Sequence, residues 1–310
     1  MRVLVTGAAG FTGSRMMQFL SQQEGVTATG LVHRTPDRRG EISRTSFVAA
    51  DLLDRESLST AVAVVHPDAI IHLAGLTRGP LDAMLLANVA GTKNILDAGY
   101  TANPDCRVLV VSSSAVYGDP SPGPIPESAS LHPLSEYGVS KMAQDALALM
   151  YHELNDLPVS VARPFNLIGP GQEDIFICGR IAGQVARILQ QKQAALELRE
   201  TRSSRDLVDV RDVVKGYWAI ISHPDFSRDC AGQAFNLGSG ISRQVSEIIA
   251  TMEEITGRNF EVILPETPAS IPIHYQQGDN SRITSLTGWK PEISFKDSLQ
   301  DMLAEASRQK

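Results

Sequence analysis

The stretch RVLVTGAAGFTG at residues 2–13 decides the fold that this sequence predicts. Its first five residues have the apolar character of a short buried parallel strand. A GxxGxxG turn follows at once, and next comes a helical pattern with apolar residues at Met16, Met17, Phe19 and Leu20. Glycines allow a tight turn and a close approach to a pyrophosphate, which free N–H groups of the helix can bind. The order therefore favours a dinucleotide-binding unit over a plain strand-to-helix turn.

The rest of the chain continues the alternation of strands and helices. Further strands are expected at 26–32, 47–50, 69–75, 108–111, 159–162 and 234–238. This order predicts an α/β fold, a Rossmann-type doubly wound parallel sheet with a smaller α/β C-terminal substrate-binding domain. The Pro- and Gly-rich segment 163–171 marks the edge of the first domain. We therefore expect an NADP-binding domain at 1–166, rejoined by 208–240, and a substrate domain made of 167–207 and 241–310.

Bulk properties exclude several classes of protein. The 310-residue chain has a net charge of −7, so it lacks the basic surface that nucleic acid or an anionic membrane would need. No apolar run reaches the length of a membrane span, and a first strand so near residue 1 leaves no room for a signal peptide. The three cysteines are scattered, which suits a reducing compartment, and we expect them to be buried or semi-buried. The cytoplasm is the expected location.

The end of the second strand bears on the choice of cofactor. NAD-binding folds place an acid there for the ribose 2′-hydroxyl. This chain has no acid at the tip, and His33, Arg34, Arg38 and Arg39 lie close by. The pattern favours NADP(H), with NAD(H) as the alternative should the basic loop face solvent.

A tyrosine and a lysine four residues apart form the candidate reaction centre. Tyr137 and Lys141 lie within SEYGVSK, one helical turn from each other. A nearby ammonium favours the phenolate, so Lys141 is expected to lower the pKa of Tyr137; the alternative is an ordinary helix with an aromatic core residue. The serine cluster at 112–114 ends the fifth strand, where open α/β sheets bind ligands, although serines also cap turns. His72 is interpreted as a structural residue at a strand end.

Taken together, these segments resemble the extended short-chain dehydrogenase/reductase superfamily of NAD(P)-dependent nucleotide-sugar epimerases, dehydratases and reductases. The segments that carry the likeness are 6–13, 51–52, 72–74, Asn88, 112–118, 137–141, 163–164 and 235–238. The resemblance implies a catalytic set of Ser113, Tyr137 and Lys141, with Asn88 completing a proton relay to the lysine. It also implies a homodimer, formed as a four-helix bundle by the helices after Asn88 and around Lys141. No metal is expected.

The predicted binding residues extend over both domains. The cofactor site is expected to comprise Gly7, Gly10, Phe11, Thr12, Gly13, His33, Arg34, Arg38, Asp51, Leu52, Leu73, Ala74, Gly75, Tyr137, Lys141 and Pro164. Substrate contacts are expected from Ser113, Ser114, Asn166, Arg180 and Arg205. An arginine fork pairs bidentately with phosphate, which suits Arg205 to a sugar-nucleotide diphosphate. The alternative for Arg205 is a surface ion pair with Asp206 or Asp209.

Three further segments narrow the resemblance. Residues 163–172, 205–214 and 287–291 are similar to the GDP-4-keto-6-deoxy-D-mannose reductases. The chain departs from that pattern at Leu167, where a histidine is usual, and at Leu207, where a phenylalanine is usual. Its loop at 77–84 is also shorter than usual. These departures bear on the sugar and the base, not on the class of chemistry.

The residues after Ser113 discriminate among the reactions of the superfamily. Dehydratases carry an acid pair there to remove one proton and expel water, whereas this chain has Ser114 and Ala115. We therefore expect NADPH-dependent reduction of the C4 keto group of a nucleotide-linked 4-keto-6-deoxyhexose in deoxysugar biosynthesis, with GDP-4-keto-6-deoxy-D-mannose as first choice. One alternative is an NAD-dependent nucleotide-sugar 4-epimerase. The other is a non-catalytic dinucleotide-binding regulator, against which the serine, tyrosine and lysine set argues.

Overall fold

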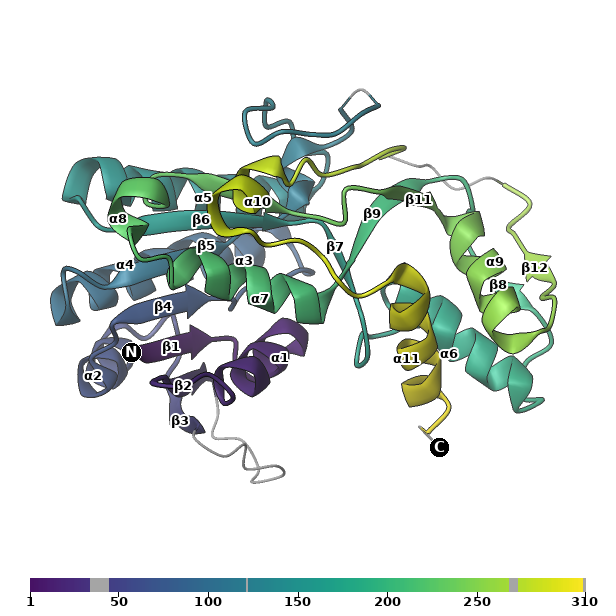
Figure 1. Cartoon of the computed structure of the whole chain (residues 1–310), viewed down its shortest axis with the longest axis horizontal. Helices are drawn as coiled ribbons and strands as arrows, with labels where there is room; N and C mark the ends of the chain where they lie inside the picture. The colour runs from purple at the N-terminus through teal and green to yellow at the C-terminus, as the bar shows by residue number, and fades with distance from the viewer. Residues whose placement is uncertain (34–44, 121, 268–272, 309–310) are drawn as a thin grey trace.

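A parallel sheet forms the centre of the molecule (Figure 1). The computed structural model describes residues 1–33, 45–120, 122–267 and 273–308. Its seven-stranded sheet has the order β10-β6-β5-β4-β1-β2-β3, and every neighbouring pair is parallel. The strands are β1 (Arg2–Thr6), β2 (Thr27–Val32), β3 (Thr45–Ala49), β4 (Ala69–His72), β5 (Arg107–Val111), β6 (Val159–Pro164) and β10 (Ala234–Leu237). The predicted α/β doubly wound sheet is confirmed.

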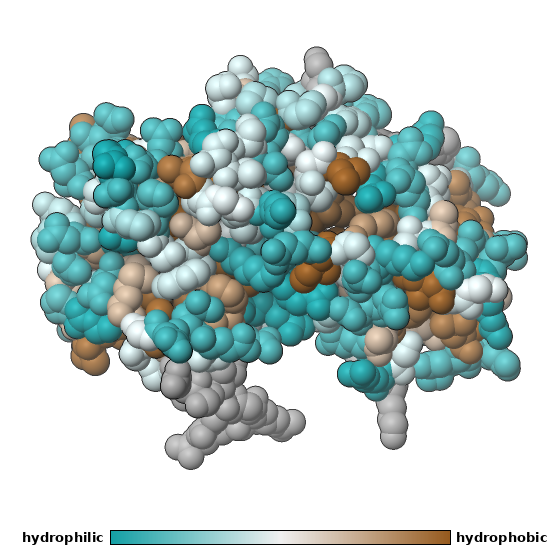
Figure 2. All heavy atoms as spheres, viewed as in Figure 1, coloured by the Kyte–Doolittle hydropathy of each residue, from teal (hydrophilic) through white to brown (hydrophobic). Residues whose placement is uncertain are grey.

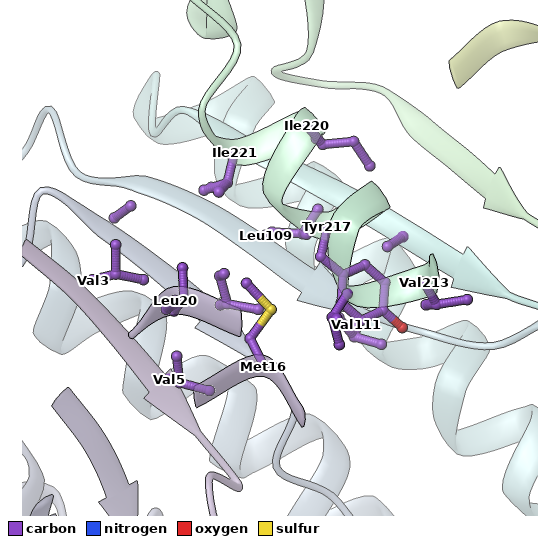
Figure 3. Close-up of a cluster of buried hydrophobic side chains, with 14 of the residues drawn as sticks. Val3, Val5, Met16, Leu20, Leu109, Val111, Val213, Tyr217, Ile220 and Ile221 are labelled. Atoms are coloured by element: carbon purple, nitrogen blue, oxygen red, sulfur yellow. The ribbon is translucent and has the colours of Figure 1, made fainter. Parts of the chain in front are cut away.

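Helices cover both faces of this sheet because side chains on a strand alternate between the two faces. Val3 and Val5 of β1 belong to the apolar cluster under α1 (Phe11–Leu20) and α7 (Val210–Ile221), which Figure 3 shows. Leu4, between them, belongs to the cluster on the opposite face. That face is covered by α2 (Arg55–Val65), α4 (Gly91–Ala102) and α5 (Glu136–Asn155).

Short elements complete the large lobe. A 3-10 turn, Ser114–Tyr117, follows β5, and α3 (Leu81–Leu85) leads through a π-helical turn, Leu86–Ala90, into α4. The helix α8 (Phe226–Asp229) lies between α7 and β10, and α10 (Ser281–Thr287) packs against β10. Asn88 lies in this π-helical turn, directly before α4.

A second lobe faces the carboxyl ends of the sheet strands (Figure 1). Its three-stranded sheet places β9 (Ser204–Asp209) between β7 (Asn166–Ile168) and β11 (Ser242–Gln244), and β8 (Leu196–Glu197) pairs with β12 (Val262–Ile263). Three helices share a separate apolar cluster there, namely α6 (Ile177–Leu189), α9 (Val245–Thr256) and α11 (Phe295–Ala306). Because β10 and α7 join the large lobe, the return of 208–240 to that lobe fits our proposed division. The helix α10, which the division assigns to the second domain with 241–310, instead packs against β10 and α7 of the large lobe. The division into 1–166 with 208–240, and 167–207 with 241–310, stays a proposal.

The surface and the cysteines match an ordinary globular chain. Figure 2 shows a face that is mostly hydrophilic, with separate apolar patches. Cys106, Cys178 and Cys230 are free and buried, as predicted. Within the described ranges, the helices are too short or too polar to cross a bilayer.

Candidate active site

The glycine turn packs so tightly that side chains are excluded from it. Gly7 has a φ of +65°, and a Cβ there would lie 2.9 Å from the backbone of Ala74. A Cβ on Gly13 would lie 2.0 Å from the Gly7 carbonyl oxygen, while the Gly10 N–H donates to that oxygen at 3.0 Å. Because α1 begins at Phe11, the first N–H groups of this helix point out of the turn. This cradle fits the pyrophosphate of a dinucleotide.

The tips of β2 and β3 meet beside this turn. The Nε2 atom of His33 lies 3.2 Å from Oδ2 of Asp51, and Oδ1 of Asp51 accepts from the Leu53 N–H at 2.9 Å. Arg34, Arg38 and Arg39, the other basic residues on which the prediction of NADP(H) rests, lie outside the described residues. The preference of the protein for NADP(H) over NAD(H) therefore stays a prediction.

Tyr137 lies in the first turn of α5. Ser135 caps this helix by accepting from the Gly138 N–H at 3.0 Å, which sets where the helix begins. Burial raises the pKa of the half-buried Tyr137 phenol, and the Ser113 hydroxyl lowers it in part. The predicted fall of this pKa is therefore wrong, and the pKa rises instead, because the desolvation of the phenolate prevails. The result is a phenol that stays protonated at neutral pH.

Lys141 is buried one helical turn beyond Tyr137 and is held from two sides. Its Nζ donates to the Val111 carbonyl at 2.8 Å and to Oε1 of Gln144 at 2.7 Å, and it lies 6.0 Å from the centre of the Tyr137 ring. Burial lowers the pKa of Lys141 to about 8, although Asp145 raises it in part. The ammonium is therefore close to its titration point in the physiological range.

Asn88 contacts the helix α5 at Ser140, the residue before Lys141. Its side chain is 0 % exposed, accepts from the Leu76 N–H at 2.7 Å, and donates to the Leu76 carbonyl and to Ser140 Oγ, both at 2.9 Å. A Cβ on Gly75 would lie 2.6 Å from Asn88 Oδ1 and 3.7 Å from Lys141 Nζ, so only glycine fits between them. The Ser140 hydroxyl donates onward to the Tyr137 carbonyl at 2.8 Å, and the proton relay from Asn88 to Lys141 stays a prediction.

Arg205 projects from β9 in the second lobe with few protein partners. Its Nη1 donates to the Ser204 carbonyl at 2.9 Å. Burial lowers the pKa of this guanidinium, while Glu200 and Asp119 raise it. The two acids that could have paired with it are otherwise engaged: Asp206 accepts from backbone N–H groups and Ser239, and Asp209 pairs with Arg211 at 2.8 Å.

The other predicted substrate contacts lie on several elements. Asn166 on β7 donates to the Asp206 carbonyl at 3.3 Å, and Arg180 on α6 donates to the Asp174 carbonyl at 3.1 Å. Ser114 is buried, and its carbonyl accepts from Gln276 at 3.3 Å. The substrate roles of these side chains stay predictions.

One buried ion pair beside the site has no local signal in the sequence. Arg163 of β6 and Asp145 of α5 meet with Nε and Oδ2 2.7 Å apart, and both side chains are almost fully buried. The same guanidinium donates to the Tyr117 hydroxyl at 2.9 Å, which in turn donates to Asn236 of β10 at 2.8 Å. These contacts bind together the helix that carries Tyr137 and Lys141, the turn after β5, and the sheet.

A glycine turn, a strand-end serine and a helical Tyr–Lys pair on a parallel sheet define a dinucleotide-binding α/β protein of the short-chain dehydrogenase type. The chain belongs to the NAD dependent epimerase/dehydratase family, whose profile matches residues 3–238. The resemblance to this family is therefore confirmed.

Individual relatives cover almost the whole chain. GDP-6-deoxy-D-mannose reductase from Pseudomonas aeruginosa is 35% identical over 98% of this chain and 96% of its own. UDP-glucose 4-epimerase from Mycolicibacterium smegmatis is 29% identical, covering 96% of each. Among solved structures, that of RMD from Pseudomonas aeruginosa complexed with NADPH has a TM-score of 0.85 and 33% identity, covering 99% of this chain and 98% of that one.

Proposed function

We propose that this protein is an NADPH-dependent reductase of the C4 keto group in a nucleotide-linked 4-keto-6-deoxyhexose, with GDP-4-keto-6-deoxy-D-mannose as first choice. The observation that carries the proposal is the arrangement at the carboxyl ends of the strands, where the Tyr137 ring lies 6.0 Å from the buried Lys141 Nζ and its phenol interacts with the Ser113 hydroxyl. Similarity to the Pseudomonas aeruginosa reductase and to the NADPH complex supports the substrate and the cofactor.

Each side chain of the site has a separate role in the proposed carbonyl reduction. NADPH, when bound, supplies the hydride that adds to the C4 carbon. Tyr137 donates its phenolic proton to the oxygen as it becomes an alkoxide, which completes the alcohol. Ser113 holds that oxygen by a hydrogen bond, and the positive charge of Lys141 favours the phenolate that Tyr137 leaves. The amides of the glycine turn would hold the pyrophosphate of the cofactor.

A nucleotide-sugar 4-epimerase is the second candidate, because it needs the same three side chains and because UDP-glucose 4-epimerase is also a relative. The two reactions differ in how they use the cofactor. An epimerase must keep its oxidised cofactor through the cycle, since the same hydride leaves and returns, whereas a reductase exchanges cofactor at each turnover. Dehydration is disfavoured because Ser114 and Ala115 cannot act as an acid pair.

The amount of cofactor bound and consumed distinguishes the two reactions. We expect the purified protein to contain little bound nicotinamide, to consume one NADPH per product formed, and to use NADPH better than NADH at limiting concentrations. It should not interconvert UDP-glucose and UDP-galactose. Absorbance at the nicotinamide band and product analysis with a panel of 4-keto sugar nucleotides measure these outcomes. Purification with near one equivalent of NAD, together with inversion of a sugar without net NADPH loss, would establish the epimerase instead.

Arg205→Ala tests the substrate site. If Arg205 binds the diphosphate, its loss should raise the substrate KM about 10- to 100-fold, because a hydrogen bond to a charged group contributes about 1.5–3 kcal/mol. The KM for NADPH should change little. Arg202→Ala, which removes an exposed arginine from the same segment, is the matched control. Equal substrate KM values for the two variants would remove Arg205 from the site.

We also propose the predicted homodimer. Apolar side chains stay exposed along the outer surface of the large lobe, on the π-helical turn, α4 and α5: Leu86, Tyr100, Val139, Met150 and Leu154. Covering such a surface with the same surface of a second copy would form a four-helix bundle from the α4 and α5 pairs.

A further inference from the structure

A chain of buried polar side chains connects the strand before the glycine turn to Lys141. Thr6 at the end of β1 has its Oγ1 2.7 Å from Nδ1 of His72, at the end of β4. Nε2 of His72 lies 2.9 Å from Oγ1 of Thr92 on α4, and Nε2 of Gln144 on α5 lies 2.6 Å from the same oxygen. Oε1 of Gln144 then accepts from Lys141 at 2.7 Å. The first four side chains are all 0 % exposed.

One arrangement of the hydrogens makes every contact in this chain a hydrogen bond. The Thr92 hydroxyl donates to the Asn88 carbonyl at 2.6 Å, so its oxygen accepts from both Gln144 and His72. His72 therefore carries its proton on Nε2, and its Nδ1 accepts from Thr6. Burial and the charge of Lys141 lower the pKa of His72 to about 3, so the ring is neutral, in line with its predicted structural role. The orientation of the Gln144 amide follows, with its oxygen toward Lys141.

Charged groups around Lys141 are arranged so that none of the described acids pairs with it. Asp145, on the same helix, is engaged with Arg163 of β6 at 2.7 Å. His72 of β4 is neutral, and Tyr137 presents its ring at 6.0 Å. The ammonium is instead held by two neutral oxygens, those of Val111 and Gln144, which leaves one of its three N–H donors for other partners.

We propose that Gln144 is a positioning residue for Lys141. The Thr6–His72–Thr92 chain fixes the Gln144 amide, and the amide oxygen holds the Lys141 ammonium. Because the amide is neutral, it adds no negative charge that would offset the effect of the ammonium on Tyr137. This inference rests on the proposed function in one respect, that Lys141 and Tyr137 act together in the reduction. A neutral amide supplies an acceptor without supplying a counter-charge, which a carboxylate at the same place would do.

Two nearly isosteric substitutions should move the titration in opposite directions. Reduction needs both Tyr137 and Lys141 protonated, so kcat falls as the pH rises through the pKa of this pair. Gln144→Leu removes an acceptor from the charged lysine and should shift the alkaline limb of kcat down by about one pH unit. Gln144→Glu adds a counter-charge and should shift it up by a similar amount while lowering kcat. Loss of packing alone would not produce opposite shifts.

Gln184→Leu is the matched control, because Gln184 is a buried glutamine on α6 whose amide bonds the backbone of Glu197 at 2.9 and 2.7 Å. It should leave the alkaline limb in place. If both Gln144 variants also leave it in place, Gln144 only packs and the proposal is overturned. Should Gln144→Leu not fold, the upward shift expected for Gln144→Glu decides the matter.

A second measurement separates this proposal from the reductase assignment. The titration of Lys141 can be followed by NMR of the lysine ε-carbons, assigned by the resonance that Lys141→Met removes. We expect the Lys141 titration to fall in Gln144→Leu and to rise in Gln144→Glu. Those shifts without reduction of any 4-keto sugar would uphold the role of Gln144 and refute the proposed function. Reduction without those shifts would uphold the proposed function and refute the role of Gln144.

Discussion

Tyr137→Phe is expected to lower kcat about 10²- to 10⁴-fold, because general acid catalysis by a positioned side chain contributes about this much. The substitution removes the phenolic proton and keeps the ring that lies 6.0 Å from Lys141 Nζ. Packing and cofactor affinity should therefore stay nearly intact. Because burial raises the pKa of this phenol, the wild-type donor is present at neutral pH and is lost as the pH rises through that value.

Single-turnover and steady-state rates with NADPH, together with fluorescence titration of NADPH binding, measure the two effects separately. Tyr100→Phe is the matched control, since Tyr100 is 41 % exposed on α4 and is not among the predicted site residues. It should react at the wild-type rate. A Tyr137→Phe rate within a few-fold of wild type would mean that another group supplies the proton.

Arg163→Met is expected to destabilise the protein by about 3–5 kcal/mol, because removal of one partner leaves the other charge buried and unpaired. The exposed fractions of the two side chains are 5% for Arg163 and 1% for Asp145, so water cannot replace the lost partner. The hydroxyl of Tyr117 also loses its charged donor. Since Asp145 lies on the helix that carries Lys141, the active site should loosen together with the fold.

Urea denaturation measures this effect. Arg163→Met combined with Asp145→Leu removes both charges and should recover a large part of the lost stability. Lys296→Met is the matched control, because Lys296 pairs with Glu254 at 2.6 Å with both side chains about half exposed. Exposed pairs contribute about 0–1 kcal/mol. If Arg163→Met is no less stable than Lys296→Met, the buried pair has no net role in folding.

The parts of the fold and site that the sequence predicts correctly are local in the chain. Consecutive residues at 2–20 carry the pattern that predicts a strand, a glycine turn and a helix. The structure forms β1 and α1 there. The four-residue spacing of Tyr137 and Lys141 places them one turn apart on any helix, and α5 spans both. Apolar runs also located the strands of the central sheet, because a strand covered on both faces needs a continuous apolar run.

Packing between distant segments decided the rest. The pKa of Tyr137 rises where the helical spacing alone predicted a fall, because the cost of burying a phenolate depends on the tertiary packing around the ring. Gln144 meets Thr92 across 52 residues, and Gln276 reaches the Ser114 carbonyl across 162. Neither pair leaves a periodic signal in the chain, since each hydrogen bond forms only once the helices and the sheet have packed. Solvent exclusion and long-range hydrogen bonding are tertiary properties, and they set the electrostatics of this site.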